Sequence, residues 1–378
     1  MTSSKSPNRT SKQERRDRKR REAIAAHPRR LAHETMMIVA PPWADAVRGL
    51  IERMRPPPGA PPVLVEERQI SSDAAFMAML HGRFGLETQA FGWDRELALA
   101  NVQCLCSLAE CAINYEIGGR KSFWVDGGLA ELLAQTTLDI AGDVLKLPFP
   151  SCAFLFDDPR TLEIADALRS LAATRRVSPS RMLTVYVFPI PRDLGDTGLR
   201  FVFLADAFDG EWPYLVTREV PLDGKRNLDE ILASHPEPDE PDGSADPFFA
   251  SEEMRALLHL VINAVLYATS CDFTSEIRRP PARASLGPGG KALELSGETV
   301  FYLPNRIVIG PPKGADDLPP RHPGRQIEKR FWVRGHWRKP NPTWQDQRLR
   351  WIAPYLKGPE MTAIIERMYD LKGKGSAK

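Results

Sequence analysis

The residues best suited to chemistry crowd together near the C-terminal end of the chain. Residues 331–352 hold four of the eight tryptophans, one histidine and a dense set of arginine and lysine. Guanidinium groups can pair with phosphates through two parallel hydrogen bonds, and tryptophan rings can stack on bases. We therefore expect a contact surface for a polyanion, with RNA or the ribosome as the partner. The candidate binding residues are Trp332, Arg334, Gly335, His336, Trp337, Arg338, Lys339, Arg348, Arg350 and Trp351.

The pattern of side chains predicts a basic β-ribbon over residues 331–352, called the basic ribbon below. Two runs alternate as strands do, and the Asn-Pro pair between them is typical of a turn. The face that we expect to make the contact holds Trp332, Arg334, His336 and Arg338. The face that we expect to be buried holds Trp337 together with Phe331, Val333, Gly335 and Lys339. Arg348 and Arg350 also share a face, so pairing in register would merge the arginines into one stripe.

His336 has three open roles. An imidazole can take the proton of an RNA 2′-hydroxyl while nearby cations stabilise the charged phosphorane, so His336 is a candidate catalytic residue of a metal-free ribonuclease. It can instead stack on RNA or form hydrogen bonds with it. The third role is structural, with the histidine tying the ribbon to the rest of the fold. The sequence is consistent with all three.

Charge is distributed very unevenly over a chain whose net charge is only +2. Residues 1–30 carry eleven Lys and Arg against three acids, and residues 321–358 carry ten against two, so each segment has a net charge of +8. Residues 31–320 have a net charge of −15. Basic ends on an acidic body suit a polyanionic partner and limit indiscriminate coating of nucleic acid. A disordered, solubilising tail is an equally simple interpretation of residues 1–30.

Composition and motifs disfavour several other classes. The five cysteines form no disulfide framework, and no apolar run reaches the roughly 18 residues that a membrane-spanning helix needs. We therefore expect a cytoplasmic protein without membrane contact. Phosphate-binding loops, dinucleotide-binding glycine patterns and zinc-protease helices are missing from the sequence, so we expect no cofactor and no metal.

Two groups of residues could be mistaken for metal sites. Asp157 and Asp158 follow a predicted strand, with Asp206 and Asp209 as companion acids for Mg²⁺, but an Asp-Pro pair is also an ordinary turn and helix cap. The second group has the wrong spacing for zinc and is better explained as core thiols. It consists of Cys104, Cys106 and Cys111.

The chain is expected to divide into three parts. They are a basic, Pro-rich extension and linker at residues 1–62, an α+β body at residues 63–320, and the ribbon with a terminal helix at residues 321–378. Periodicity predicts helices at residues 43–54, 72–80, 94–115, 127–136, 159–172, 228–232, 251–270 and 360–371. Strands are predicted at residues 149–156, 183–190, 199–205 and 213–220. This order favours an α+β fold with an antiparallel sheet packed with helices, a C-terminal ribbon and a disordered basic N-terminus.

The C-terminal motif resembles the ending of a known family. Val333-Arg334-Gly335-His336-Trp337-Arg338, followed by Arg348-x-Arg350-Trp351-x-x-Pro354, is similar to the second type V-A anti-CRISPR family. The resemblance implies a phage or plasmid protein that represses a target gene after transcription. It also implies action on the message during translation, with a nascent polypeptide of the target as a further partner. By motif, the resemblance extends to Arg334, Gly335, His336, Trp337, Arg350 and Trp351.

Three hypotheses about function follow from the residues and the resemblance. The first is a regulator that represses specific messages through contact with RNA or the ribosome. The second is a metal-free ribonuclease that uses His336. The third is a peptide-binding module that contacts no nucleic acid and captures a peptide at the sheet or beside the apolar helix of residues 251–270.

Overall fold

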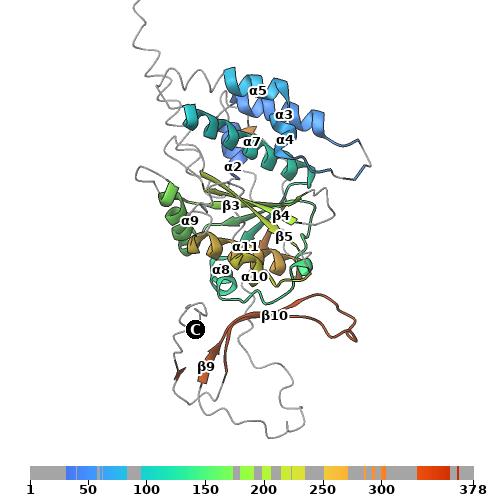
Figure 1. Cartoon of the computed structure of the whole chain (residues 1–378), viewed down its shortest axis with the longest axis vertical. Coiled ribbons are helices and arrows are strands. Elements are labelled where there is room, and N and C mark those ends of the chain that lie inside the picture. Colours follow the sequence, from blue (N-terminus) through green and yellow to red (C-terminus); the bar gives the residue numbers. More distant parts are fainter. Residues whose placement is uncertain are drawn as a thin grey trace, which may run out of the picture.

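The computed structural model describes residues 31–39, 41–57, 60–61, 63–82, 95–172, 179–190, 198–205, 214–222, 224–234, 251–270, 285–286, 292–293, 299–303, 330–357 and 364–365. Within these residues a six-stranded sheet has helices on both faces, and the basic ribbon lies beyond one of the helical layers (Figure 1). The predicted α+β class is confirmed. The predicted disorder of the basic N-terminus falls outside the described residues.

The central sheet has the strand order β5-β4-β3-β2-β1-β8. Strands β2 to β5 pair antiparallel as predicted, whereas β1 is parallel to both β2 and β8. The sequence did not reveal β1 or β8, because each is only five residues long and neither shows clear alternation. The bounds are β1 (Lys121–Val125), β2 (Cys152–Phe156), β3 (Leu183–Ile190), β4 (Gly198–Ala205), β5 (Tyr214–Pro221) and β8 (Thr299–Leu303), with a separate small pair of β6 (Ser285–Leu286) and β7 (Ala292–Leu293).

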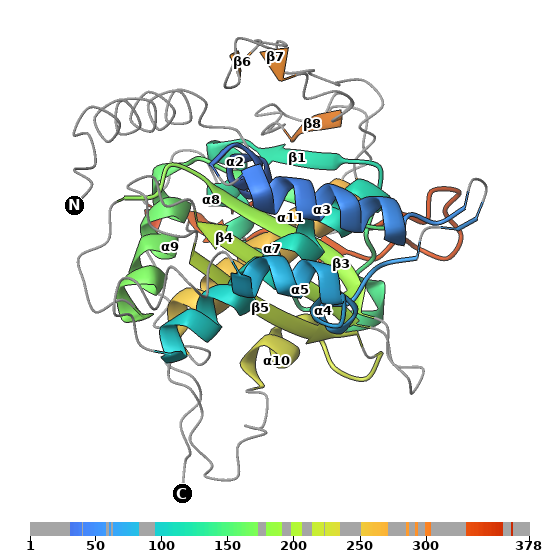
Figure 2. The same cartoon turned by 90° about the horizontal axis from the view of Figure 1, so that it is seen from above.

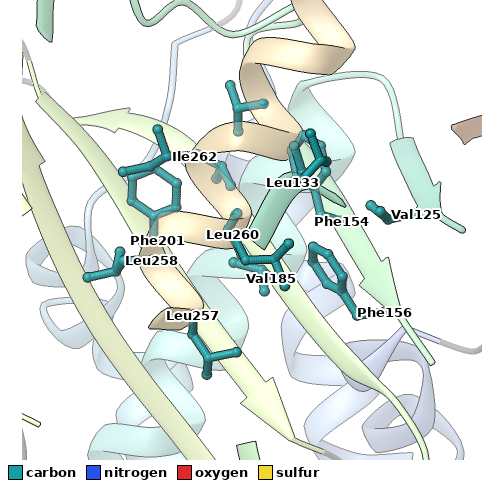
Figure 3. Packing of buried hydrophobic residues seen from close by; sticks show 14 of the residues in the cluster. Val125, Leu133, Phe154, Phe156, Val185, Phe201, Leu257, Leu258, Leu260 and Ile262 are labelled. Atoms are coloured by element: carbon teal, nitrogen blue, oxygen red, sulfur yellow. The ribbon is translucent and has the colours of Figure 1, made fainter. Parts of the chain in front are cut away.

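One helical layer lies between the sheet and the ribbon (Figure 1). It consists of α8 (Gly127–Ala134), α9 (Pro159–Ala172), α10 (Leu228–Ala233) and α11 (Glu252–Ser270), all of which were predicted. The most apolar helix, α11, is buried along most of its length, and in Figure 3 its side chains meet Phe154, Val185 and Phe201 of the sheet. Each such buried side chain contributes about 1.5–3 kcal/mol relative to exposure. This layer is therefore a firm base for the ribbon.

The second helical layer covers the opposite face of the sheet (Figure 2). It consists of α2 (Ala32–Val39), α3 (Pro41–Met54), α4 (Glu67–Ser71), α5 (Ala74–Leu80) and α7 (Arg95–Ile117). The predicted apolar face of α3 is confirmed, since Trp43, Val47 and Leu50 are fully buried. These residues lie within the predicted N-terminal extension of residues 1–62, yet they pack in the same core as α7. Among the described residues no helix is long and apolar enough to cross a membrane.

The cysteines of α7 belong to this second core. Cys106 and Cys111 are buried, and Cys104 is half-buried. Burial is the main cause that raises the pKa of Cys104 to about 12 and that of Cys106 to about 11. Thiols this reluctant to ionise are poor metal ligands, because thiolates are the form that binds metals. The interpretation as packed core thiols is consistent with these surroundings.

The basic ribbon and the residues that follow it form short strands that pair outside the central sheet. They are β9 (Arg330–Val333), β10 (His336–Arg338), β11 (Arg350–Ile352), β12 (Tyr355–Lys357) and β13 (Ile364–Ile365). The helix predicted at residues 360–371 is described only at Ile364–Ile365, where the prediction is wrong. These two residues form a strand parallel to β9, and paired β-branched side chains favour that conformation.

Candidate nucleic-acid interface

The two runs of the basic ribbon pair antiparallel and in register only over residues 336–338 and 350–352. The first run is not one continuous strand as predicted, because its start, β9, pairs with β12 in a separate small sheet. Trp337 lies opposite Trp351, and Arg338 lies opposite Arg350. Residues directly opposite one another in an antiparallel pair project to the same face. Arg338 and Arg350 therefore share one face, and the two tryptophans lie together on the other face.

The tryptophan face of the ribbon is fixed to the helical layer. Trp337 is 7% exposed, and its Nε1 donates a hydrogen bond of 2.7 Å to Oδ1 of Asn263 on α11. Nε1 of Trp351 donates to Oγ1 of Thr136 at 3.1 Å, and its ring meets Tyr267 edge-on at 5.1 Å between centroids. Buried indole groups with satisfied N–H donors hold an element firmly in place. The predicted burial of the Trp337 face is confirmed at Trp337.

Asn263 completes this attachment from within the core. Besides accepting from Trp337, it donates through Nδ2 to the carbonyl oxygens of Thr136 and His259, each at 3.1 Å. A fully buried amide with its donor and acceptor both used fixes the position of its partners, since any shift would leave a polar atom unpaired. Asn263 gives no signal in the sequence, because it lies within a largely apolar helix.

Gly335 lets the ribbon approach the body closely. Its carbonyl oxygen accepts a hydrogen bond of 2.9 Å from the backbone N–H of Thr137. A Cβ at this position would collide with Oγ1 of Thr136 and would lie 3.0 Å from Cδ of Pro354. The glycine predicted as a binding residue therefore acts at the attachment, where no larger residue fits without displacing its neighbours.

The arginine face points away from this attachment and gathers around Trp344. The Cζ atom of Arg338 lies 5.2 Å from the centroid of the Trp344 ring, and that of Arg350 lies 4.6 Å from it. Both arginines are exposed. Within the described residues neither is hydrogen-bonded to a carboxylate. Trp344 was not among the predicted site residues because it lies in the turn, outside the two alternating runs.

Arg348 differs from its neighbour Arg350. Its Nε donates to Oδ1 of Asp346 at 3.1 Å, and its backbone N–H donates to the same oxygen at 3.0 Å. These bonds are the main cause of the lowered pKa of the Asp346 carboxyl. The predicted binding residue Arg348 is thus engaged with a carboxylate of its own turn. Lys339 was expected on the buried face and is exposed, because β10 ends at Arg338 and the alternation stops there.

Arg334 and His336 lie on either side of Gly335, the residue at which the ribbon is attached to the body. Arg334 is exposed and its charge acts on Asp229 of α10 and His259 of α11, whose side chains lie 3.9 Å apart. Burial is the largest cause of the shift in both groups, raising the pKa of Asp229 and lowering that of His259. His336 is half-buried, with Nδ1 at 3.3 Å from the carbonyl oxygen of Arg334. For Trp332 only the backbone is described, as part of β9.

The acids whose positions in the sequence could suit Mg²⁺ have local partners. Oδ1 of Asp158 accepts a hydrogen bond of 2.9 Å from the backbone N–H of Thr161, which is the geometry of a cap at the start of α9. Oδ1 of Asp157 accepts from Nε1 of Trp124 at 3.1 Å. Among the described residues no group of three His, Cys, Asp or Glu side chains is placed to hold a metal ion. The companion acids Asp206 and Asp209 lie outside those residues.

A family model decides the relationship that the C-terminal motif suggested. The model described as AcrVA2-like, anti-CRISPR type V subtype A2 family, matches residues 123–358, from β1 through the end of the ribbon. This chain belongs to the AcrVA2-like family. Among solved structures, it is similar to one described as the crystal structure of AcrVA2, with a TM-score of 0.43 and 11% identity, over 85% of this chain and 96% of that chain. No curated protein matches the sequence.

The region that matches the AcrVA2-like family includes the whole basic ribbon. The matched residues include the attachment at Thr136, Asn263 and Gly335 as well as the arginine face. The helices α2 to α7 lie before residue 123 and outside the match. The ribbon and its base are therefore parts of the shared region, and the second helical layer lies N-terminal to it.

Proposed function

We propose that this AcrVA2-like protein represses a target gene after transcription by contacting RNA, free or in the ribosome, through the arginine face of the basic ribbon. The observation that supports the proposal most directly is the arginine pair, the name used below for Arg338 and Arg350. These two cations stand side by side on an exposed face, and neither forms a hydrogen bond with a carboxylate among the described residues. The mobile-element origin and the contact with a nascent polypeptide remain parts of this proposal.

Holding two like charges close together costs free energy. Directly opposed cations destabilise a strand pair, so a contact that neutralises them is favoured. RNA supplies phosphates for guanidinium forks and flat bases for stacking. The buried face of the ribbon adds to the affinity, because a surface already held by Trp337 and Trp351 has little conformational freedom left to lose on binding.

The test compares the parent chain with two variants of equal net charge. In the first, Arg338→Gln and Arg350→Gln remove the arginine pair. In the matched control, Arg48→Gln and Arg68→Gln remove two exposed cations from α3 and α4 on the opposite side of the sheet. We expect the parent and the control to bind single-stranded RNA, with affinity falling as salt rises from about 50 to about 200 mM.

The ribbon variant should bind more weakly, and its slope of log affinity against log salt should be smaller by about 1.4, as expected for two lost phosphate contacts on a single strand. Equal binding by all three proteins would show that the arginine pair makes no contact. Failure of the parent to bind at about 50 mM salt would remove the RNA proposal altogether. Crosslinking in cells, followed by sequencing of the bound RNA, then identifies the message.

A further inference from the structure

The turn between β10 and β11 places two cations against one aromatic ring. Trp344 lies within 5.2 Å of the Cζ atoms of both Arg338 and Arg350, measured from the ring centroid. Its backbone N–H donates to the carbonyl oxygen of Asn341 at 2.9 Å, which fixes the turn. The attraction of each cation to the ring offsets part of the repulsion between them. Both guanidinium groups therefore pack against the same ring.

The carboxylate of Asp346, which lies in this turn, is hydrogen-bonded to Arg348 and not to the arginine pair. Asp346 accepts three hydrogen bonds from Arg348, one of them from its backbone N–H. In the part of the chain that the structure describes, Arg338 and Arg350 share the Trp344 ring and bind no carboxylate directly. A double positive charge is thus concentrated at the turn, which Figure 1 shows projecting past the body of the protein.

We propose that Arg338, Trp344 and Arg350 form a clamp for the phosphate monoester at an RNA end. This inference rests on the proposed function and narrows its ligand. Two guanidinium forks carry a charge of about +2 and can each donate two parallel hydrogen bonds. A phosphate monoester offers three terminal oxygens and a charge of about −1.5 to −2 at neutral pH. It therefore matches the pair in both charge and acceptors.

An internal phosphodiester is a poorer match for the same site. It carries a single negative charge and has two non-bridging oxygens, so it satisfies one guanidinium fork and leaves the second with less to bind. Two successive diesters could occupy the two forks only if the strand followed the line between them. Trp344 is a positioning residue in this arrangement, because its ring holds the two forks on one ligand instead of letting them spread along a strand.

The experiment uses three single-stranded RNAs of one sequence, each about 12 nucleotides long, a length within the usual site sizes for such strands. One has a 5′-phosphate, one a 3′-phosphate, and one hydroxyl groups at both ends. We expect the parent chain to bind at least one phosphorylated RNA about tenfold more tightly than the unphosphorylated one, a difference equal to about 1.4 kcal/mol.

Variants of the clamp residues then test whether the clamp causes the preference for phosphorylated RNA. Arg338→Lys keeps the charge but loses the fork, so the preference should fall while the salt dependence stays. Trp344→Leu should also reduce the preference, because it removes the ring that aligns the forks. Lys339→Gln is the matched control, because Lys339 is an exposed neighbour. Its loss should lower the affinity for all three RNAs by the same factor. Circular dichroism and thermal unfolding check that each variant keeps the parent fold.

The outcomes separate the clamp from the proposed function. Equal affinity of the parent chain for all three RNAs, with binding still weakened by Arg338→Gln, would overturn the clamp and leave RNA contact through the ribbon in place. An end preference that survives Arg338→Lys and Trp344→Leu would also overturn it. If none of the three RNAs binds at about 50 mM salt, both the clamp and the proposed function fail.

Discussion

The body and the ribbon of this molecule hold arginine in opposite ways. In the body, Nη1 of Arg200 on β4 lies 2.7 Å from Oε1 of Glu110, and its Nη2 lies 2.7 Å from Oε1 of Glu219. In the ribbon, Arg338 and Arg350 rest on an aromatic ring and bind no carboxylate among the described residues. An arginine between two carboxylates stabilises the fold, whereas the arginine pair is available to an anionic partner. Position in the fold, not residue type, separates the two roles.

The largest loss of stability is expected from removing the tryptophan that holds the ribbon arginines in place. Trp337→Ala removes a buried indole and its hydrogen bond to Asn263, so we expect the free energy of unfolding to fall by about 3–5 kcal/mol. Urea unfolding followed by circular dichroism measures the change. RNA affinity should fall as well, because the arginine pair loses its support. A loss below about 1 kcal/mol would mean that the ribbon contributes little to the stability of the body.

Removing arginine from the body and from the ribbon tests whether the two regions use this residue differently. Arg200→Ala leaves Glu110, which is 2% exposed, without its ionic partner, so we expect a loss of about 2–4 kcal/mol in the free energy of unfolding. The double change Arg338→Ala, Arg350→Ala should alter stability by no more than about 0.5 kcal/mol per residue, since both side chains are exposed. Comparable losses in the two variants would show that the ribbon arginines are structural too.

Much of the fold could be predicted because long periodic segments determine it. The apolar faces of α3 and α11 and the three consecutive strands β3 to β5 follow directly from spacing in the sequence. The parallel strands β1 and β8 could not be found in this way. They are short, and β8 joins the sheet only by pairing with β1, far away in the sequence. Pairing over such a distance leaves no local signal.

The candidate site was predictable in its strands and not in its turn. Alternation alone separated Trp337 from Arg338 and implied one stripe of arginines. The role of Trp344 depends on how the turn folds back on β10 and β11, and the pairing of Arg348 with Asp346 depends on the same turn. The division into extension, body and ribbon stays a prediction, although the core formed with α3 includes residues from the predicted extension.

A smaller effect is expected at the point where the ribbon approaches the body. Gly335→Ala places a methyl group against Thr136 and Pro354, so the ribbon must move outward. We expect a loss of about 1–3 kcal/mol in stability, as for other overpacked sites. Hydrogen exchange at the backbone N–H of Thr137, which binds the Gly335 carbonyl, should become faster. A double-mutant cycle with Thr136→Ala, which removes the Oγ1 atom that the new methyl group meets, tests whether the crowding is responsible. Unchanged exchange in Gly335→Ala would place the ribbon contact elsewhere.

The smallest effect concerns the carboxyl that Arg200 neutralises. Burial is the main cause that raises the pKa of Glu110 to about 7, while the nearby Arg200 acts in the opposite direction. The folded protein therefore binds this proton more tightly than the unfolded chain does. The stability that comes from the protonated carboxyl is complete below the ordinary pKa of a glutamate and is lost as the pH rises through about 7.

Glu110→Gln cannot titrate, so its free energy of unfolding relative to that of the parent should increase between about pH 5 and pH 8, by on the order of 1 kcal/mol. Urea unfolding at several pH values measures this difference, and Glu219→Gln, which alters an exposed partner of the same arginine, is the control. A difference that does not change with pH would mean that Glu110 titrates as it does in the unfolded chain. A pH-dependent difference that appears in Glu110→Gln and not in Glu219→Gln therefore originates at the buried carboxyl of the body.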